Sequence, residues 1–152
     1  MIEILALAAM VLADQLTKVW AVARLQPVHT MEIFPGLLNL TYVENTGAAF
    51  SILRGQTLFL IVLPIIACAL IGYLLVRRKV SHPLGRWSLV LILGGAIGNL
   101  IDRIFRGAVV DFFEIRAFRF AIFNVADIFV TIGAVLLFVY ILFFSQKGDA
   151  KE

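Results

Sequence analysis

LFLIVLPIIACALIGYLLV, residues 58–76, is an unbroken apolar stretch that ends at Arg77-Arg78-Lys79. Its 19 residues include no charged side chain. A helix needs about 20 apolar residues to cross a hydrocarbon core of about 30 Å. The stretch therefore predicts a transmembrane helix and places the chain among the integral membrane proteins.

The composition of the whole chain agrees with this class. Of its 152 residues 62% are hydrophobic and 15% are charged, whereas soluble domains have roughly 45–50% apolar and 25% charged residues. We expect one membrane-embedded domain over residues 1–152, with spans at about 2–23, 58–76, 84–105 and 120–144. The first span lacks the basic start of a cleaved signal peptide, so we interpret it as retained.

Two segments do not have the composition of spans. Residues 26–56 are polar and rich in turn formers, and within them residues 37–43 have the β-branched and aromatic content of short strands. We expect a small β structure outside the membrane there. Residues 108–119 mix aromatic and charged side chains, which favours an interfacial segment.

The basic residues predict the orientation. A net charge of +3 is compatible with nucleic-acid binding, but the basic residues lie in short segments between apolar stretches, so we expect no nucleic-acid partner. The connection between the second and third spans holds four of them, Arg77, Arg78, Lys79 and Arg86. The positive-inside tendency places this connection and both termini in the cytoplasm. Residues 103–119 are also basic and favour the opposite orientation, although Asp111 and Glu114 offset them.

The sequence supports neither a metal site nor a disulfide bond. The single cysteine, Cys68, lies inside an apolar stretch, so there is no disulfide framework. Neither His29 nor His82 has a partner at metal-ligand spacing. We expect no metal and no cofactor.

Polar residues within the spans gather at one depth. They are Asp14 and Lys18 in the first span, Asn99, Asp102 and Arg103 in the third, and Asn124 and Asp127 in the fourth. At 1.5 Å per residue, all lie in the half of the membrane away from the termini. An Asp or Lys near the centre of a span costs about 2.5–3.5 kcal/mol on insertion. The cluster is therefore a candidate functional site.

Simpler interpretations stay open for parts of this cluster. Asp14 and Lys18 are spaced i, i+4 and can form a purely structural ion pair. Gly94 and Gly98 form Gly-x-x-x-Gly, which more often indicates close helix packing than catalysis. Residues 45–47, Asn-Thr-Gly, are typical of a turn.

Asp111 and Asp127 are the pair with the clearest chemistry. They lie 16 positions apart, about 24 Å along a single helix, so the chain between them must double back for their carboxyls to meet. Two carboxylates at close range share one proton. Such a pair can polarise a carbonyl with its acid and deprotonate a water with its base. This predicts an aspartic peptidase.

Five segments together carry a resemblance to a known family. They are Asp14-Gln15-x-x-Lys18, Asn45-Thr46-Gly47-Ala48-Ala49-Phe50, the stretch 94–103 (GGAIGNLIDR), Val109-Val110-Asp111-Phe112, and Phe123-Asn124-Val125-Ala126-Asp127. In this order, over nearly the whole chain, the sequence resembles the bacterial lipoprotein signal peptidases, also called signal peptidase II.

The resemblance implies a fold and a set of site residues. The fold is an all-α integral membrane protein of four transmembrane helices, with a small extracytoplasmic β-cradle and a short interfacial helix. Asp111 and Asp127 correspond to the catalytic pair. The residues that hold substrate or support the site are Asn45, Gly47, Asn99, Arg103, Asn124, Asp14, Lys18 and Asp102. Asp102 is the rival catalytic candidate, and we prefer Asp111 because Asp102 can pair with Arg103.

The resemblance also implies an activity and a location. The activity is cleavage of the signal peptide from prolipoproteins before the diacylglyceryl-modified cysteine. We expect lipid-modified prolipoproteins and membrane lipid as partners, globomycin-type inhibitors, a monomer, and a bacterial cytoplasmic membrane with the active site near its outer face. Two alternatives are a small proton-coupled transporter that uses Asp14, Asp102 and Asp127 as a relay, and a structural subunit.

Overall fold

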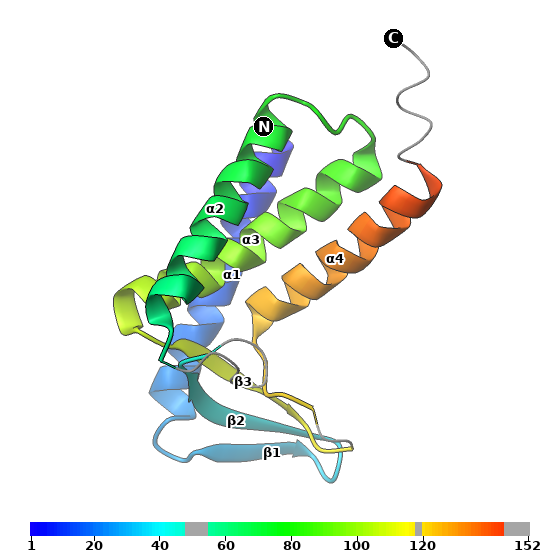
Figure 1. The fold of residues 1–152 in the computed structure, drawn as a ribbon. Helices are drawn as coiled ribbons and strands as arrows, with labels where there is room; N and C mark the ends of the chain where they lie inside the picture. Colours follow the sequence, from blue (N-terminus) through cyan, green and yellow to red (C-terminus); the bar gives the residue numbers. More distant parts are fainter. Residues whose placement is uncertain (48–54, 118–119, 145–152) are drawn as a thin grey trace.

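The computed structural model describes residues 1–47, 55–117 and 120–144. Its elements are α1 (Ile2–Arg24), β1 (Thr30–Phe34), β2 (Leu38–Asn45), α2 (Thr57–Val76), α3 (Pro83–Arg106), β3 (Val109–Ile115) and α4 (Val125–Phe143). The strands lie at one end of the helices (Figure 1). The N-terminus, the α2–α3 connection and the C-terminal end of α4 lie at the other end. The chain is therefore mostly helical, with one small sheet.

Three helices in the described part of the chain, α2, α3 and α4, are long and apolar enough to cross a membrane. Helix α1 has 23 residues, but it carries the charged residues Glu3, Asp14, Lys18 and Arg24. Length and composition therefore support three of the four expected spans.

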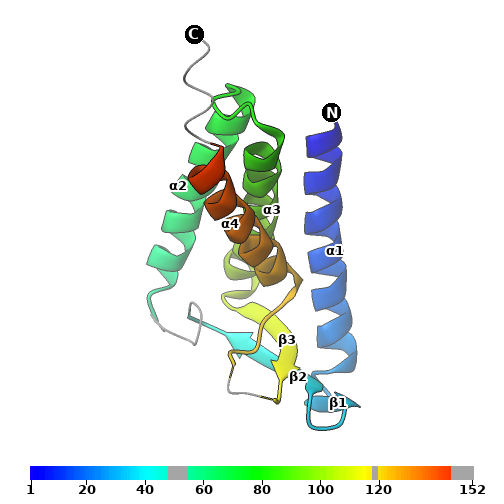
Figure 2. The ribbon, with the colours of Figure 1, turned by 90° about the vertical axis from the view of Figure 1, so that its right-hand side faces the viewer.

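Helix α3 is the centre of the arrangement. Helices α1 and α2 lie on opposite sides of it, and α4 packs against it as well (Figure 2). Its glycines allow these approaches. A Cβ on Gly94 would meet Met10, and one on Gly98 would lie 2.5 Å from a carboxylate oxygen of Asp14. The interpretation of these two glycines as packing residues is confirmed.

Helix α4 begins at Val125, about five residues later than the expected start near residue 120. Asn124 caps it: its side-chain oxygen accepts a hydrogen bond from the backbone N–H of Asp127 at 3.0 Å. The Asp127 carboxylate in turn accepts one from the backbone N–H of Asn124 at 3.2 Å. This capping box satisfies two N–H groups that the first turn would otherwise leave unpaired. It also fixes Asp127 in the first turn of the helix.

The sheet is antiparallel, in the order β1-β2-β3. Its third strand, Val109–Ile115, forms most of the segment that we expected to be interfacial rather than a span. The described part of that segment forms no spanning helix, and its place at the membrane interface stays a prediction. The first four residues of the strand are all buried, and Val110 and Phe112 pack against Ala21 and Leu25 at the end of α1. The short interfacial helix that the resemblance implies is not among the described residues.

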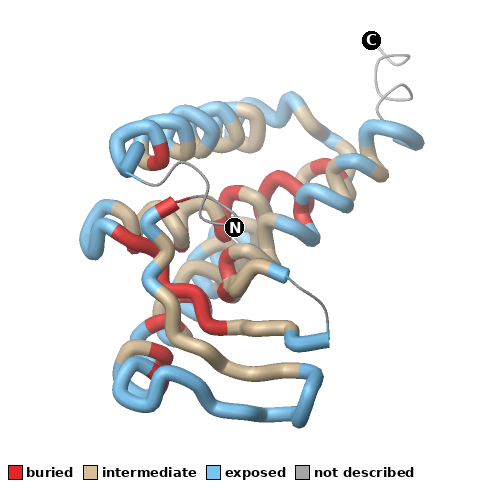
Figure 3. Tube along the Cα trace, turned by 60° about the horizontal axis from the view of Figure 1, so that its bottom comes forward, coloured by how far each residue is buried: buried red, intermediate tan, exposed pale blue. Residues whose placement is uncertain are grey.

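Burial divides the molecule into an inside and an outside. The buried segments gather in the middle of the fold, whereas long stretches of the outer helices and of β1 are exposed (Figure 3). The buried polar and charged residues are Asp14, Lys18, Ser88, Asp102, Asp111 and Asn124. All except Ser88 are among the site residues that the sequence predicted.

Candidate active site

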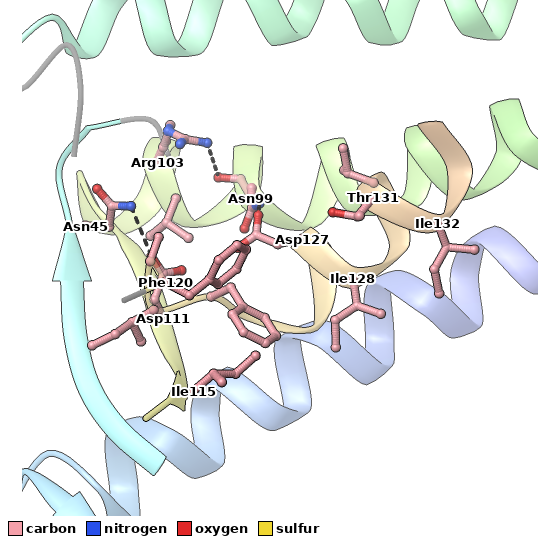
Figure 4. A pocket seen from close by; sticks show the side chains of 15 residues that line it. Asn45, Asn99, Arg103, Asp111, Ile115, Phe120, Asp127, Ile128, Thr131 and Ile132 are labelled. Atoms are coloured by element: carbon pink, nitrogen blue, oxygen red, sulfur yellow. Dashed lines mark hydrogen bonds between the residues drawn. The ribbon is translucent and has the colours of Figure 1, made fainter. Parts of the chain in front are cut away.

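Asp111 and Asp127 line one pocket of about 450 Å³. Asp111 comes from β3 and Asp127 from the first turn of α4 (Figure 4). The chain between them doubles back through Phe123, whose backbone pairs with that of Phe113. The two carboxyls are thus brought together from separate elements, as the peptidase hypothesis requires.

Two asparagine side chains connect the carboxyls. The amide nitrogen of Asn124 donates to Asp111 Oδ1 at 2.6 Å and to Asn99 Oδ1 at 3.1 Å. The amide nitrogen of Asn99 donates to Asp127 Oδ1 at 2.8 Å. A continuous hydrogen-bonded path therefore runs from one aspartate to the other.

The Asn45-Thr46-Gly47 segment is a turn and part of the site at once. The side-chain oxygen of Asn45 accepts a hydrogen bond from the backbone N–H of Gly47 at 3.0 Å, and its amide nitrogen donates to Asp111 Oδ2 at 3.0 Å. Arg103 donates to the carbonyl of Gly47 at 3.1 Å. The rest of that motif, residues 48–50, lies outside the described residues.

Asp102, the rival candidate, does not line the pocket. It is fully buried, and its carboxylate accepts from the backbone N–H of Val110 at 3.1 Å. Its ion-pair partners among the described residues are Lys18 at 3.1 Å and Arg106 at 3.7 Å. The expected pairing with Arg103 was wrong, because the Arg103 side chain turns to the pocket wall instead. Lys18 and Arg106, not Arg103, are therefore the partners of Asp102, and the preference for Asp111 as the catalytic residue stays a prediction.

Asp14 and Lys18 form the expected ion pair, with Lys18 Nζ 2.9 Å from Asp14 Oδ2. Both side chains are fully buried, and neither lines the pocket. The pair is more than a contact within α1, however, since Lys18 also donates to Asn99 Oδ1 at 2.9 Å.

The environment of Asp111 favours its protonated form. Burial of the carboxyl, and then the charge of Asp127, raise the pKa of Asp111 to about 6, although hydrogen bonds from Asn45 and Asn124 act in the opposite direction. Desolvation and a neighbouring like charge both disfavour a carboxylate. Asp111 can therefore keep a proton at a pH at which an exposed aspartate is fully ionised.

The rest of the pocket wall is mainly apolar, and sequence reasoning missed it. The additional lining residues are Val109, Ile115, Phe120, Ala121, Ile122, Phe123, Ile128, Val130, Thr131 and Ile132. Thr131 lies one helical turn beyond Asp127, so the spacing i, i+4 was a signal that could have found this face of α4. The segment 120–123 had no such signal, because its position depends on the cap at Asn124.

Known proteins agree with this architecture. The family described as "Signal peptidase (SPase) II" matches residues 6–143. The lipoprotein signal peptidase of Clostridioides difficile strain 630 is 43% identical over 97% of this chain and 99% of its own. That of Symbiobacterium thermophilum is 46% identical over 99% of this chain and 100% of its own. A solved bacterial membrane enzyme has a TM-score of 0.84 at 33% identity, covering 99% of this chain and 92% of that one.

These relatives match nearly the whole chain, and the family's matched region runs from the first third of α1 to the end of α4. The resemblance inferred from the five motifs is confirmed. The chain belongs to the signal peptidase II family.

Proposed function

We propose that this chain removes signal peptides from prolipoproteins in a bacterial membrane, cutting before the diacylglyceryl-modified cysteine, with Asp111 and Asp127 as an aspartic catalytic pair. One observation carries the aspartic assignment: the two carboxyls line a common pocket and are connected through Asn99 and Asn124. The names of the relatives support the substrate class.

The chemistry needs one protonated and one ionised carboxyl. Asp111 is the acid, which the rise in its pKa supports, and Asp127 is the base. The Asp127 carboxylate takes a proton from a water whose oxygen attacks the scissile carbonyl, while Asp111 gives its proton to the carbonyl oxygen. When the tetrahedral intermediate collapses, the C–N bond breaks and the leaving amine takes the proton from Asp127. A hydroxyl of the intermediate returns its proton to Asp111 as the new carboxyl group forms, which restores the starting pair.

The pocket suits a lipid-bearing peptide. Its apolar wall over Ile128 and Ile132 extends along α4 away from the aspartates (Figure 4). Polar groups of Asn45 and Arg103 lie at the aspartate end, where a peptide backbone offers its own N–H and C=O groups. Gly47, two residues after Asn45, lets that backbone approach closely.

Helix α1 is the fourth span in this proposal. Its outward side chains, such as Leu5, Leu12 and Leu16, are apolar and more than half exposed, at 65%, 58% and 59%. Its central charges, Asp14 and Lys18, are paired inside the protein. A helix with this division presents hydrocarbon to lipid and polar groups to its neighbours.

The proposed orientation places both termini in the cytoplasm and the pocket near the outer face. The basic segment Arg77-Arg78-Lys79 lies at the same end of the molecule as the N-terminus (Figure 1), and the positive-inside tendency assigns that end to the cytoplasm. The sheet and the aspartates lie towards the opposite end. A monomeric state, lipid neighbours and inhibition by globomycin-type compounds stay predictions.

The decisive test replaces each aspartate by its isosteric amide. Asp111→Asn and Asp127→Asn should each lower cleavage of a purified lipidated prolipoprotein in detergent by at least about 100-fold, the lower bound for a general acid or base. Glu32→Gln is the matched control: this exposed carboxylate on β1 is outside the pocket, so its variant should cleave normally. Full activity in either aspartate variant would refute the pair.

The pH profile tests the acid role of Asp111. Its protonated fraction is high below its pKa and falls above it, so kcat/KM should decline as the pH rises through about 6. Asn45→Ala removes a hydrogen bond that favours the carboxylate, and should move this alkaline limb to higher pH. An unchanged or opposite shift would show that Asp111 is not the acid.

The comparisons do not favour the transporter. That alternative also requires polar groups that continue to the other face, whereas α2, which is described in full, has no charged residue. Proteoliposomes with the purified chain should therefore show no flux driven by a pH gradient, while they still cleave prolipoprotein.

A further inference from the structure

Lys18 makes three contacts with side-chain oxygens although its side chain is fully buried. Its ammonium lies 2.9 Å from Asp14 Oδ2, 3.1 Å from Asp102 Oδ2 and 2.9 Å from Asn99 Oδ1. A lysine has three N–H protons, so each of these acceptors can take one. The contacts reach from α1 to two positions on α3.

Each of the two carboxylates also binds the backbone beside one catalytic aspartate. Asp14 Oδ1 accepts from the N–H of Ala126, the residue before Asp127, at 2.9 Å. Asp102 Oδ2 accepts from the N–H of Val110, the residue before Asp111, at 3.1 Å. A single ammonium therefore connects two carboxylates, each of which is bonded to one of the two catalytic segments.

The third contact sets the direction of an amide. Because an ammonium can only donate, Asn99 must present its oxygen to Lys18. Its amide nitrogen then faces Asp127 and donates to it. The same oxygen accepts from Asn124, whose amide nitrogen also donates to Asp111. Lys18 thus stands at the start of the hydrogen-bonded path that reaches both aspartates.

We propose that Lys18 is a positioning residue for the reaction: through Asp14, Asp102 and Asn99 it fixes the backbone and the amide partners of both catalytic aspartates. This inference rests on the proposed function. The further polar and charged groups near the buried carboxylates are Gln15, which donates to Asp14 at 3.1 Å and to Asp102 at 3.4 Å, and Arg106, 3.7 Å from Asp102. Neither contacts Asn99 among the hydrogen bonds of the described residues, so Lys18 and Asn124 are the two donors that hold the oxygen of that amide.

The test separates positioning from folding through kcat and KM. Lys18→Met should lower kcat about 100-fold, as a displacement of about 1 Å in catalytic groups does, while KM stays near its wild-type value because the pocket wall is unchanged. Each value is expressed per folded molecule, with the folded fraction taken from thermal unfolding in detergent. A wild-type kcat would overturn the proposal.

Lys18→Met alone leaves two buried carboxylates without a counter-ion, which is strongly destabilising. The triple variant Lys18→Met/Asp14→Asn/Asp102→Asn removes all three charges and keeps an oxygen for each backbone N–H. If Lys18 only balances charge, the triple variant recovers kcat and the proposal fails. If Lys18 positions the pair, folding recovers and kcat stays low.

Asp14→Ala provides a variant in which Lys18 keeps Asp102 as its counter-ion. It removes the acceptor for the N–H of Ala126, together with the contacts of Asp14 to Lys18 and Gln15, and leaves the acceptor for Val110 in place. We therefore expect kcat to fall while KM holds, and a wild-type kcat here would also contradict the proposal. Arg86→Met is the matched control, because it breaks the other ion pair between α1 and α3, Arg86–Glu3. It should lower the unfolding temperature and leave kcat unchanged.

The two proposals fail in different ways. Activity in Asp111→Asn or Asp127→Asn would rule out the proposed catalytic pair itself. If the aspartate variants are inactive but the Lys18 and Asp14 variants have a normal kcat, only the positioning role of Lys18 is ruled out.

Discussion

Helices α2 and α3 are both apolar enough to cross a membrane, yet they differ in almost everything else. Half of the spanning stretch of α3 is buried in the protein, against 6% of that of α2. Leu60 is the one buried residue of α2, whereas α3 buries nine, including three glycines in its central part, Ser88 and Asp102. Among the described elements, α2 packs mainly against α3, whereas α3 contacts every other helix.

The difference teaches how a membrane chain separates insertion from function. Lipid tails are as apolar as leucine, so no hydrophobic force drives helices together inside a bilayer, and packing and hydrogen bonds must do so. Helix α2 is apolar enough to insert but offers few residues for packing or hydrogen bonding. Helix α3 has small residues that admit its neighbours and polar residues that bond to them. Substitutions should therefore have unequal effects in the two helices.

The largest expected effect is a cavity in α3. Leu89 is 5% exposed and Leu70 in α2 is 57% exposed. Leu89→Ala should lower the free energy of unfolding by about 2–5 kcal/mol, because a buried methyl-rich side chain leaves a void. Leu70→Ala exchanges lipid contacts and should change it little. Thermal unfolding in detergent checks both variants. Equal losses of unfolding free energy would contradict the distinction between the two helices.

A smaller effect is expected from added volume at a helix contact. A Cβ on Gly95 would collide with the backbone oxygen of Ala126 and lie 2.7 Å from Val130, both in α4. Gly95→Ala should cost about 1–3 kcal/mol, as overpacking does, and should lower cleavage by displacing α4 and with it Asp127. Gly72→Ala in α2 meets nothing within 4 Å. It should be neutral or slightly stabilising, so a similar loss in both variants would contradict this account.

The same comparison explains which features were predictable. Residues 58–76 predict a span from their own apolar composition, without knowledge of which other segments they contact. The polar cluster was also predictable, since charges are costly in lipid wherever the helices lie. The structure brings Asp111 and Asp127 to one pocket with Asn45, Asn99 and Arg103, as the motifs suggested.

The features that escaped prediction depend on distant partners. Strand β3 pairs with β2, so that Leu40 lies opposite Phe113, and no local pattern in residues 108–119 reveals that partner. Whether Asp102 pairs with Arg103 or Lys18 depends on the rotation of α1 against α3. The amino-acid composition of the two helices does not determine that rotation. The start of α4 was misjudged because Phe120 and Phe123 are as apolar as the helix that follows them.

The smallest expected effect tests the junction at which the two compared helices meet. Arg86 of α3 donates to the carbonyl oxygens of Leu75 and Val80, at the end of α2 and beyond it, and pairs with Glu3 of α1 at 2.6 Å. Glu3→Gln removes the charge but leaves both carbonyl contacts, so the loss should be about 0.2–1 kcal/mol, as for a partly exposed ion pair. Arg86→Met also removes the donor from α2 and should cost more. If both variants lose the same free energy in detergent, the carbonyl contacts contribute nothing, and α2 is held to α3 by side-chain packing alone.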